Sequence, residues 1–382
     1  MEAGEFAEVL ATVRDFVRRE VLPREAEIDE RDEIPADIQN KAAQIGLFGW
    51  ALPVEYGGLG LSMAEDVRLA IELGYTTPAF RSLFGTNNGI AGQAIVRHGT
   101  DRQRDHWLPK LAAGSAIASF ALTETEAGSD PSGLRSTAVA RDGEYALSGT
   151  KRFITNAPIA DVFVVFARTD PAATGRTGIS ALLVPSASPG LTVGPRDEKM
   201  GQAGAWTAEV RLDDVRVPAT ALLGAEGDGF RIAMAALARG RLHIAAVCVG
   251  MAERALAEAV AHAGDTRQGG RPIGDHQLVR ALLADSHAEL AAGRALVHDA
   301  AAAYDAGTDR TLGPSSAKLF CSEMLGRVAD RAVQVHGGDG YMRGVTVERI
   351  YRDARLFRIY EGTSEIQRLV IGRQLLRDRR DV

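Results

Sequence analysis

The distribution of apolar residues divides the chain into three parts, and this division constrains the fold more than any other feature. From residue 5 to about 118, apolar residues recur at helical spacing, as in FAEVLATVRDFV. Between about 120 and 223, short β-branched runs such as DVFVVFART and ISALLVP are separated by Gly, Pro and Asp turns. From residue 229 onward, long Ala-, Leu- and Arg-rich segments return. We therefore predict helices, then an antiparallel β domain, then helices again.

The composition indicates a soluble globular protein that acts on a small molecule. Of the 382 residues, 46% are hydrophobic, so a substantial core can form. The formal net charge of −6 gives no broad attraction for nucleic acid or an anionic membrane. Cys248 and Cys321 lack metal-binding spacing and are interpreted as core residues in a reducing compartment, so no metal site is expected. Without a leader pattern or a long apolar span, the protein is expected to be cytoplasmic and not inserted in a membrane.

The common nucleotide and hydrolase motifs are absent. No GxGxxG, GxxxxGK[ST], HExxH or GxSxG pattern occurs in the sequence. A Rossmann unit, a P-loop NTPase, a zinc protease and a serine hydrolase are therefore unsupported, and any cofactor site must be built differently.

Two segments of the β domain carry groups that suit a cofactor. Residues 121–133, ALTETEAGSDPSG, combine hydroxyls with a small turn whose amides can hold a phosphate or a polar ring edge. Residues 149–158, GTKRFITNAP, place an aromatic plane, an aliphatic residue and a hydroxyl together at Phe153, Ile154 and Thr155. Taken alone, the composition of the first segment favours an ordinary turn, and the second segment is typical of ordinary core.

Two further segments lie in the last helical part. Residues 334–340, QVHGGDG, form a glycine cluster where the backbone can approach a ligand, or a helix end followed by a turn. Glu361 sits between Tyr360 and Gly362, where partial desolvation would raise its pKa toward that of a general base. Alternatively it begins a helix, with Thr363, Ser364 and Glu365 as a capping arrangement.

Together, these segments resemble the acyl-CoA dehydrogenases along essentially the whole chain. ALTETEAGSD is similar to the first family signature, KRFITNA to the flavin-stacking strand, and QVHGGDGY through YRDARLFRIYEGTSEIQR to the second signature and catalytic loop. The segment at 198–224 resembles the exit from the β domain. The resemblance implies an α+β multidomain fold with an N-terminal helical domain (1–118), a middle antiparallel β domain (119–224) and a C-terminal four-helix bundle (225–382). It also implies a homotetramer that holds FAD at subunit contacts.

The resemblance assigns roles to individual positions. Cofactor-binding positions are Leu122, Thr123, Ser129, Phe153, Ile154, Thr155, Arg267, Gln277, Gln334, Gly337, Gly338, Thr363 and Glu365. Substrate-binding positions are Ser129, Arg241, which matches an arginine that helps to hold the CoA portion, and Gly362.

Glu361 matches the catalytic base of the family. Some members carry the base on an earlier helix, at the position occupied here by Gly240, which has no side chain to act as one. The implied reaction is FAD-dependent α,β-dehydrogenation of an acyl-CoA to the trans-2-enoyl-CoA, with electron-transfer flavoprotein as the acceptor. An acyl-CoA oxidase reaction and a non-catalytic partner subunit of a heteromeric complex remain as alternatives.

The chain departs from the family pattern at several positions. Thr266 and Gly269 stand where relatives supply an Arg and a Phe to the FAD of a neighbouring subunit, which predicts weaker FAD binding unless Arg267 substitutes. Details of ligand contact are also affected at Ala238, Thr125 and Gly344.

Arg81 and Ser82 follow an aromatic residue as an Arg-Ser pair does in glutaryl-CoA dehydrogenases. This suggests that Arg81 reads a distal carboxylate on the acyl group. The residues themselves favour a different interpretation, in which Arg81 caps a helix end or lies at a subunit surface, because Pro78 and Gly85 lie close by.

Overall fold

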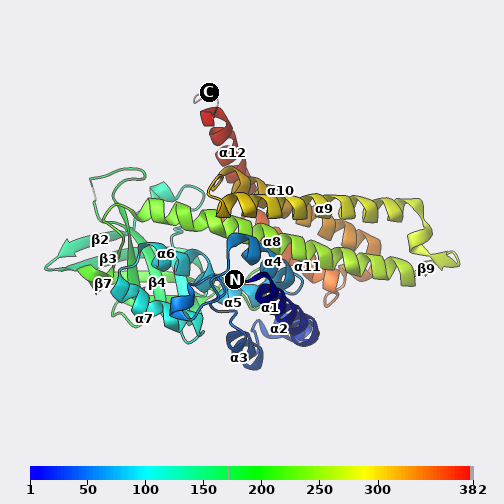
Figure 1. Cartoon of the computed structure of the whole chain (residues 1–382), viewed down its shortest axis with the longest axis horizontal. Helices are drawn as coiled ribbons and strands as arrows, with labels where there is room; N and C mark the ends of the chain where they lie inside the picture. The colour runs from blue at the N-terminus through cyan, green and yellow to red at the C-terminus, as the bar shows by residue number, and fades with distance from the viewer. Residues whose placement is uncertain (171, 379–382) are drawn as a thin grey trace.

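The computed structural model describes residues 1–170 and 172–378 and has three successive parts (Figure 1). The β domain lies at one end of the molecule, and the long C-terminal helices run from it toward the other end. At that far end the chain forms the small hairpin of β9 (Arg267–Gln268) and β10 (Arg271–Pro272). The C-terminal helix projects away from the body.

The N-terminal part is helical, as predicted. Its helices are α1 (Ala3–Phe16), α2 (Glu25–Arg31), α3 (Ala36–Gln44), α4 (Met63–Gly74), α5 (Pro78–Asn88), α6 (Ile90–His98) and α7 (Asp101–Ala112). Shorter π or 3-10 segments occupy Val17–Val21, Leu22–Arg24 and Val54–Tyr56. α4 begins with a capping box, in which Ser62 accepts from the Glu65 amide and Glu65 accepts from the Ser62 amide at 2.8 Å. Edge-to-face contacts among Trp50, Phe80 and Phe84 fill the core of this part.

The middle part is one sheet. Its strands are β1 (Ala118–Ala121), β2 (Thr137–Arg141), β3 (Glu144–Thr155), β4 (Val162–Arg168), β5 (Ile179–Pro185), β6 (Leu191–Arg196), β7 (Thr207–Pro218) and β8 (Leu222–Leu223). Short 3-10 turns lie at Pro131–Gly133, Ala157–Ile159 and Ala219–Ala221. The strand order is β6-β7-β3-β2-β4-β5-β8, with β1 beside β4.

Most ladders of the sheet are antiparallel, as predicted, but two are not. β1 and β2 each pair in parallel with β4. Neither pair consists of consecutive strands, so the chain between them is long enough for the crossover that parallel pairing needs. The alternating pattern within each strand could not reveal this, because it reports the faces of a strand and not its neighbour.

The C-terminal part is again helical. It contains α8 (Gly229–Asp265), α9 (Gln277–Asp305), α10 (Leu312–His336), α11 (Thr346–Ala354) and α12 (Ser364–Asp378). Shorter 3-10 segments occupy Ile273–Asp275, Asp339–Tyr341 and Arg355–Arg358. Cys248 and Cys321 are buried in the core of this part and are not disulfide-bonded, which confirms their interpretation as core residues.

α8 joins this part to the N-terminal helices through a close crossing with α4. A Cβ added at Gly250 would lie 2.0 Å from the Ile71 carbonyl oxygen, and one at Gly74 would lie 2.3 Å from that of Val247. Only glycine permits the two backbones to approach so closely. The crossing fixes the polar residues of α4 against those of α8.

α8 is also long and apolar enough to cross a membrane by length and composition alone. In the structure, 78% of its most apolar window is buried inside the protein. Such burial is typical of the core helix of a soluble protein, in which a long apolar helix packs against other helices.

Candidate active site

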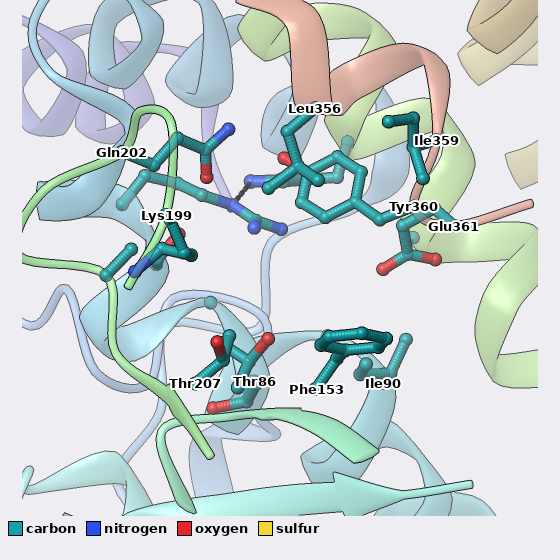
Figure 2. Close-up of a pocket in the computed structure, with 18 of the residues that line it drawn as sticks. Thr86, Ile90, Phe153, Lys199, Gln202, Thr207, Leu356, Ile359, Tyr360 and Glu361 are labelled. Atoms are coloured by element: carbon teal, nitrogen blue, oxygen red, sulfur yellow. Dashed lines mark hydrogen bonds between the residues drawn. The ribbon is translucent and has the colours of Figure 1, made fainter. Parts of the chain in front are cut away.

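A cavity of about 520 Å³ lies where the three parts of the chain meet. α4, α5, the strands β3 and β7, the loop that joins β6 to β7, α8 and the segment at 355–361 all contribute to its lining. Figure 2 shows Leu356, Ile359, Tyr360 and Glu361 on one side of it. Phe153, Ile90, Thr86 and Thr207 lie on the opposite side.

Glu361 points into this cavity and faces the ring of Phe153 across it (Figure 2). It lies between the 3-10 segment that ends at Arg358 and the start of α12, with a φ of 56° in the left-handed region. A side chain at residue 240 would collide with the carboxylate, because a Cβ there would lie 2.8 Å from Oε2. Gly240 therefore gives the Glu361 carboxylate its space, in addition to being unable to serve as a base.

The loop that carries Glu361 is held by two buried side chains. Lys318 Nζ donates to the Gly362 carbonyl at 2.7 Å, and Gln367 Nε2 donates to the carbonyls of Glu361 at 3.1 Å and Gly362 at 3.0 Å. Both side chains come from helices, α10 and α12, so the unusual backbone of Glu361 rests on rigid elements. Sequence analysis missed both residues.

Burial and nearby cations act in opposite directions on Glu361. Burial raises the pKa of Glu361 above its ordinary value, and Arg81, Arg241 and Lys318 limit the rise. Oε2 is buried and has no hydrogen-bond partner within the described residues. A desolvated, unpartnered carboxylate that can still ionise is suited to act as a general base.

Phe153 forms the opposite wall. It lies at an irregularity in the β3–β7 ladder, between Lys151 and Ile154, with a φ of 56°. Its side chain is 60% exposed, which is unusual for an aromatic residue within a sheet. An aromatic face held in a bulge and turned to a cavity can serve as a stacking platform.

The neighbours of Phe153 divide between cavity and core. Thr155 lines the cavity together with Thr207 of the adjacent strand. The Ile154 side chain is buried in the β-domain core, so this residue could meet a cofactor only through its backbone.

The first signature segment lies behind the platform and not in the cavity lining. Leu122 is buried, Thr123 is half-buried and Ser129 is exposed. A buried ion pair links this segment to β3, since Lys151 Nζ lies 2.7 Å from Glu124 Oε1. The Thr123 carbonyl also accepts from the Arg152 amide at 2.9 Å. The segment is thus fixed next to Phe153, outside the cavity itself.

A second group of predicted cofactor residues lies far from Glu361. All five are exposed: Arg267 on β9, Gln277 at the start of α9, and Gln334, Gly337 and Gly338 at or just after the end of α10. Figure 1 shows β9 at the far end of the helical part. The ring stack of His262 on His336 joins the ends of α8 and α10 there. From Gly240 to that end, α8 extends roughly 40 Å, further than one dinucleotide reaches. Within one chain, a single cofactor cannot contact both groups.

The altered segment at 266–270 forms a tight hairpin turn. Gly269 and Gly270 both have positive φ, 60° and 83°, and connect β9 to β10. Such a pair is the favoured two-residue turn of a hairpin. A Phe at 269 would be strained in this conformation, so the turn explains the glycine. Arg267 is exposed on this hairpin and donates to the Gly270 carbonyl at 3.5 Å.

The predicted substrate and cofactor positions around Glu361 are brought together, with one exception. Gly362 and Thr363 continue the Glu361 loop, and Thr363 Oγ1 accepts from the Ile366 amide at the start of α12. Glu365 is exposed in the first turn of α12, and the Ser364 hydroxyl donates to Glu323 Oε1 at 2.6 Å, so of the two predicted capping hydroxyls only that of Thr363 bonds a helix amide among the described contacts. Arg241 is buried, donates to Ser315 Oγ at 3.4 Å and does not line the cavity. Its position suits an electrostatic effect on Glu361 rather than direct contact with CoA.

Arg81 lines the cavity, contrary to the interpretation that it caps a helix end or lies at a surface. Its Nε donates to His243 Nε2 at 2.8 Å. Gly85 makes this position possible, because a Cβ there would lie 2.9 Å from the guanidinium carbon. His243 is in turn bonded to Asp66, and neither residue was found from sequence. The available signal was the i, i+4 spacing of Arg239 and His243, which places both on one face of α8.

Three family models match the chain in order. They describe the acyl-CoA dehydrogenase N-terminal domain over residues 4–115, the middle domain over 119–215 and the C-terminal domain over 227–376. The chain belongs to the acyl-CoA dehydrogenase family. As a member of this family it is an oxidoreductase. The three matches confirm the resemblance found in the sequence, and their order agrees with the helical, β and helical parts of the chain.

Individual relatives match over nearly their whole length. An acyl-CoA dehydrogenase of Bacillus subtilis (strain 168) is 41% identical over 95% of this chain and 96% of its own. A caffeyl-CoA reductase-Etf complex subunit of Acetobacterium woodii is 38% identical over 95% of this chain and 96% of its own. The solved butyryl-CoA dehydrogenase of Megasphaera elsdenii has a TM-score of 0.93 at 35% identity, covering 97% of this chain and 98% of that one.

Proposed function

We propose that the chain is an FAD-dependent dehydrogenase that converts a saturated acyl-CoA into the trans-2-enoyl-CoA, with Glu361 as the α-proton base. The observation that carries this proposal is the Glu361 carboxylate, whose Oε2 is buried and unpartnered within the described chain and which faces the exposed ring of Phe153 across one cavity. A substrate chain between them would have a base on one face and an aromatic platform on the other.

The residues of this chain would contribute mainly by position. Glu361 takes the α-proton, and its backbone N–H polarises the thioester carbonyl, which acidifies that proton. Lys318 and Gln367 hold the loop in one conformation, so that the carboxylate is already oriented for proton transfer when the substrate binds. The enclosing apolar residues Leu356, Ile359 and Tyr360 exclude water and keep the base desolvated.

The residues on the Phe153 side fit a flavin. Phe153 offers an exposed aromatic face. Thr155 and Thr207 lie in the same wall, and the Thr207 hydroxyl, which donates to Asp197, can still accept from the polar edge of a ring system. FAD would supply the hydride acceptor for the β-carbon. The predicted contacts of Leu122, Thr123 and Ser129 fit the same side, next to the platform.

Phe153→Ala is expected to weaken FAD binding. Loss of the stacking face should raise the FAD dissociation constant roughly tenfold, whereas Val139→Ala, which removes an exposed apolar side chain from β2, should leave it unchanged. Equilibrium titration of apoprotein with FAD, followed by flavin fluorescence, measures both. Equal FAD affinity of the Phe153→Ala protein and the unchanged protein would show that the ring is not the platform.

The split of the predicted cofactor residues supports an oligomer. The far-end group can reach a cofactor only in another subunit, and the exposed Leu278, Tyr341 and Met342 lie in the same region. α12 also exposes Leu369, Leu375 and Leu376. We propose a homotetramer that completes each FAD site across a subunit contact, in the cytoplasm. An electron-transfer flavoprotein is the proposed electron acceptor, since one relative is named as a subunit of such a complex.

The position of Arg81 supports an anionic group on the acyl tail. No carboxylate of the described residues lies within ion-pair distance of Arg81, although its side chain lines the cavity. A partly buried cation without a carboxylate in ion-pair distance favours a ligand that carries an anion. A glutaryl-like thioester therefore fits better than a purely aliphatic one.

Arg81→Met is expected to abolish this preference. The ratio of kcat/KM for glutaryl-CoA to that for butyryl-CoA should fall at least about tenfold, because a charge-assisted hydrogen bond is lost. The ratio cancels any general effect of Arg81 on Glu361. Octanoyl-CoA serves as a second uncharged substrate. A preference for aliphatic thioesters in the unchanged protein would rule out this role for Arg81.

Anaerobic bleaching of the bound flavin by a panel of acyl-CoAs tests the proposed function as a whole. Bleaching by at least one thioester is expected. Rapid reoxidation of the bleached protein in air would favour the oxidase alternative, and purification without a flavin spectrum would favour the non-catalytic partner subunit.

A further inference from the structure

A buried polar cluster joins Arg81 to three further side chains of the cavity wall, His243, Asp66 and Arg239, none of which is the group that removes the proton. Arg81 Nε lies 2.8 Å from His243 Nε2, and His243 Nδ1 lies 2.7 Å from Asp66 Oδ1. The second oxygen of Asp66 accepts from Arg239 Nη2 at 2.8 Å. The side chains of His243 and Asp66 are only 5% and 3% exposed. Four polar groups therefore form one continuous hydrogen-bonded chain along the cavity wall.

The hydrogen-bond directions define the state of His243. The guanidinium can only donate, so Nε2 must accept and carries no proton. Nδ1 then carries the proton and donates to Asp66. A charged imidazole would turn a second N–H against Arg81 and break the bond. Burial, followed by the charge of Arg81, lowers the pKa of His243, in agreement with this neutral form.

The cluster is rigid because its members stand on packed helices. Asp66 lies on α4 and Arg81 on α5, while Arg239 and His243 lie one turn apart on α8. The close crossing of α4 and α8 at their glycines fixes Asp66 relative to Arg239 and His243. Trp50 stacks on the His243 ring at 5.4 Å and 13°, which prevents the ring from tilting.

The charges of the cluster leave one cation in excess. Asp66 engages His243 with one oxygen and Arg239 with the other. Burial opposes ionisation of Asp66, but His243 and Arg239 outweigh it and keep the pKa of Asp66 below its usual range. Asp66 therefore neutralises Arg239, and within the cluster the excess charge is that of Arg81, which also acts on the Glu361 carboxylate without an ion pair to it. Its Nε is occupied by His243, which leaves the two terminal nitrogens for a ligand.

We propose that Asp66 and His243 are positioning residues that orient the Arg81 guanidinium toward the cavity, and that selection of acyl thioesters with an anionic tail depends on them. The inference rests on the proposed function and adds the residues through which the anionic tail of the substrate is recognised. An unanchored arginine would lose rotamer freedom on binding, and the anchored one has already lost it. Arg239 serves the same unit by neutralising Asp66.

Binding measurements on the FAD-loaded Glu361→Gln protein test the inference without turnover. Dissociation constants of glutaryl-CoA and butyryl-CoA are measured by calorimetry. We expect His243→Leu to raise the constant for glutaryl-CoA about tenfold and that for butyryl-CoA less than about twofold. His243→Gln, which keeps an acceptor for Arg81, should restore most of the glutaryl-CoA affinity. Val249→Ala, which removes fully buried methyl groups from the same helix, is the control for general disturbance of α8.

A double-mutant cycle separates action through Arg81 from a merely structural effect. If His243 acts through Arg81, His243→Leu should change neither constant further in a protein that already carries Arg81→Met. Three results would each overturn the inference. The first is an equal loss of affinity for both thioesters in the His243→Leu protein, and the second is a full effect of His243→Leu in the protein that lacks Arg81. The third is a Glu361→Gln protein without further changes that binds glutaryl-CoA no better than butyryl-CoA. Failure of the proposed function would appear differently, as an absence of flavin bleaching by every acyl-CoA.

Discussion

Glu361→Gln is expected to keep the fold and the bound FAD and to slow flavin reduction by substrate at least about a hundredfold. The amide has nearly the same shape as the carboxylate and fits the space left by Gly240, but it cannot accept the α-proton. Stopped-flow absorbance of the flavin under anaerobic conditions measures the rate.

Glu8→Gln is the matched control for this change. Glu8 lies on α1, away from the cavity, and is exposed, so its replacement should leave the rate unchanged. If the Glu361→Gln protein reduced its flavin at nearly the normal rate, another group would have to be the base.

Lys318→Met is expected to slow flavin reduction about a hundredfold at neutral pH, because small misplacements of a catalytic group carry losses of this size. The substitution removes the donor to the Gly362 carbonyl and with it one of the two anchors of the Glu361 loop. Burial lowers the pKa of Lys318 only to about 8, so the side chain is still largely charged at neutral pH in the unchanged protein.

The same variant should shift the pH profile in a defined direction. Glu361 is active when deprotonated, so the rate rises as pH increases through its pKa. Lys318 is one of the cations that limit the rise of this pKa caused by burial. Without Lys318 the pKa of Glu361 rises further, and the midpoint of the profile moves to higher pH. A slower protein with an unchanged midpoint would contradict the electrostatic role. Ser322→Ala, one turn further along α10, controls for disturbance of the helix.

The order of the three parts and the location of Glu361 could be predicted from sequence because both rest on local patterns. Periodicity identifies helices and strands, and the YEGT segment identifies the base by resemblance. The loop conformation could not be predicted, because the φ of 56° at Glu361 is imposed by side chains of α10 and α12 rather than by its neighbours in sequence.

The Arg81 cluster, too, could not be predicted from residues that are neighbours in the sequence. Asp66 and His243 are 177 residues apart, and they meet only because glycines allow α4 and α8 to cross closely. In the sequence, Gly85 favours a helix-end or surface position for Arg81. In the structure, its missing Cβ is what admits the guanidinium. Contacts between distant helices depend on such packing, which no single segment of sequence reports.

Loss of the α-hydrogen of the substrate to water is the most direct measure of whether Glu361 removes it. Butyryl-CoA carrying deuterium at Cα is mixed anaerobically with the purified protein, and the label that remains is measured by mass spectrometry. The predicted result is the loss of one α-deuterium for each flavin reduced, with no loss by the Glu361→Gln protein. Flavin reduction that leaves the α-label in place, or equal loss of label by the two proteins, would contradict the role of Glu361.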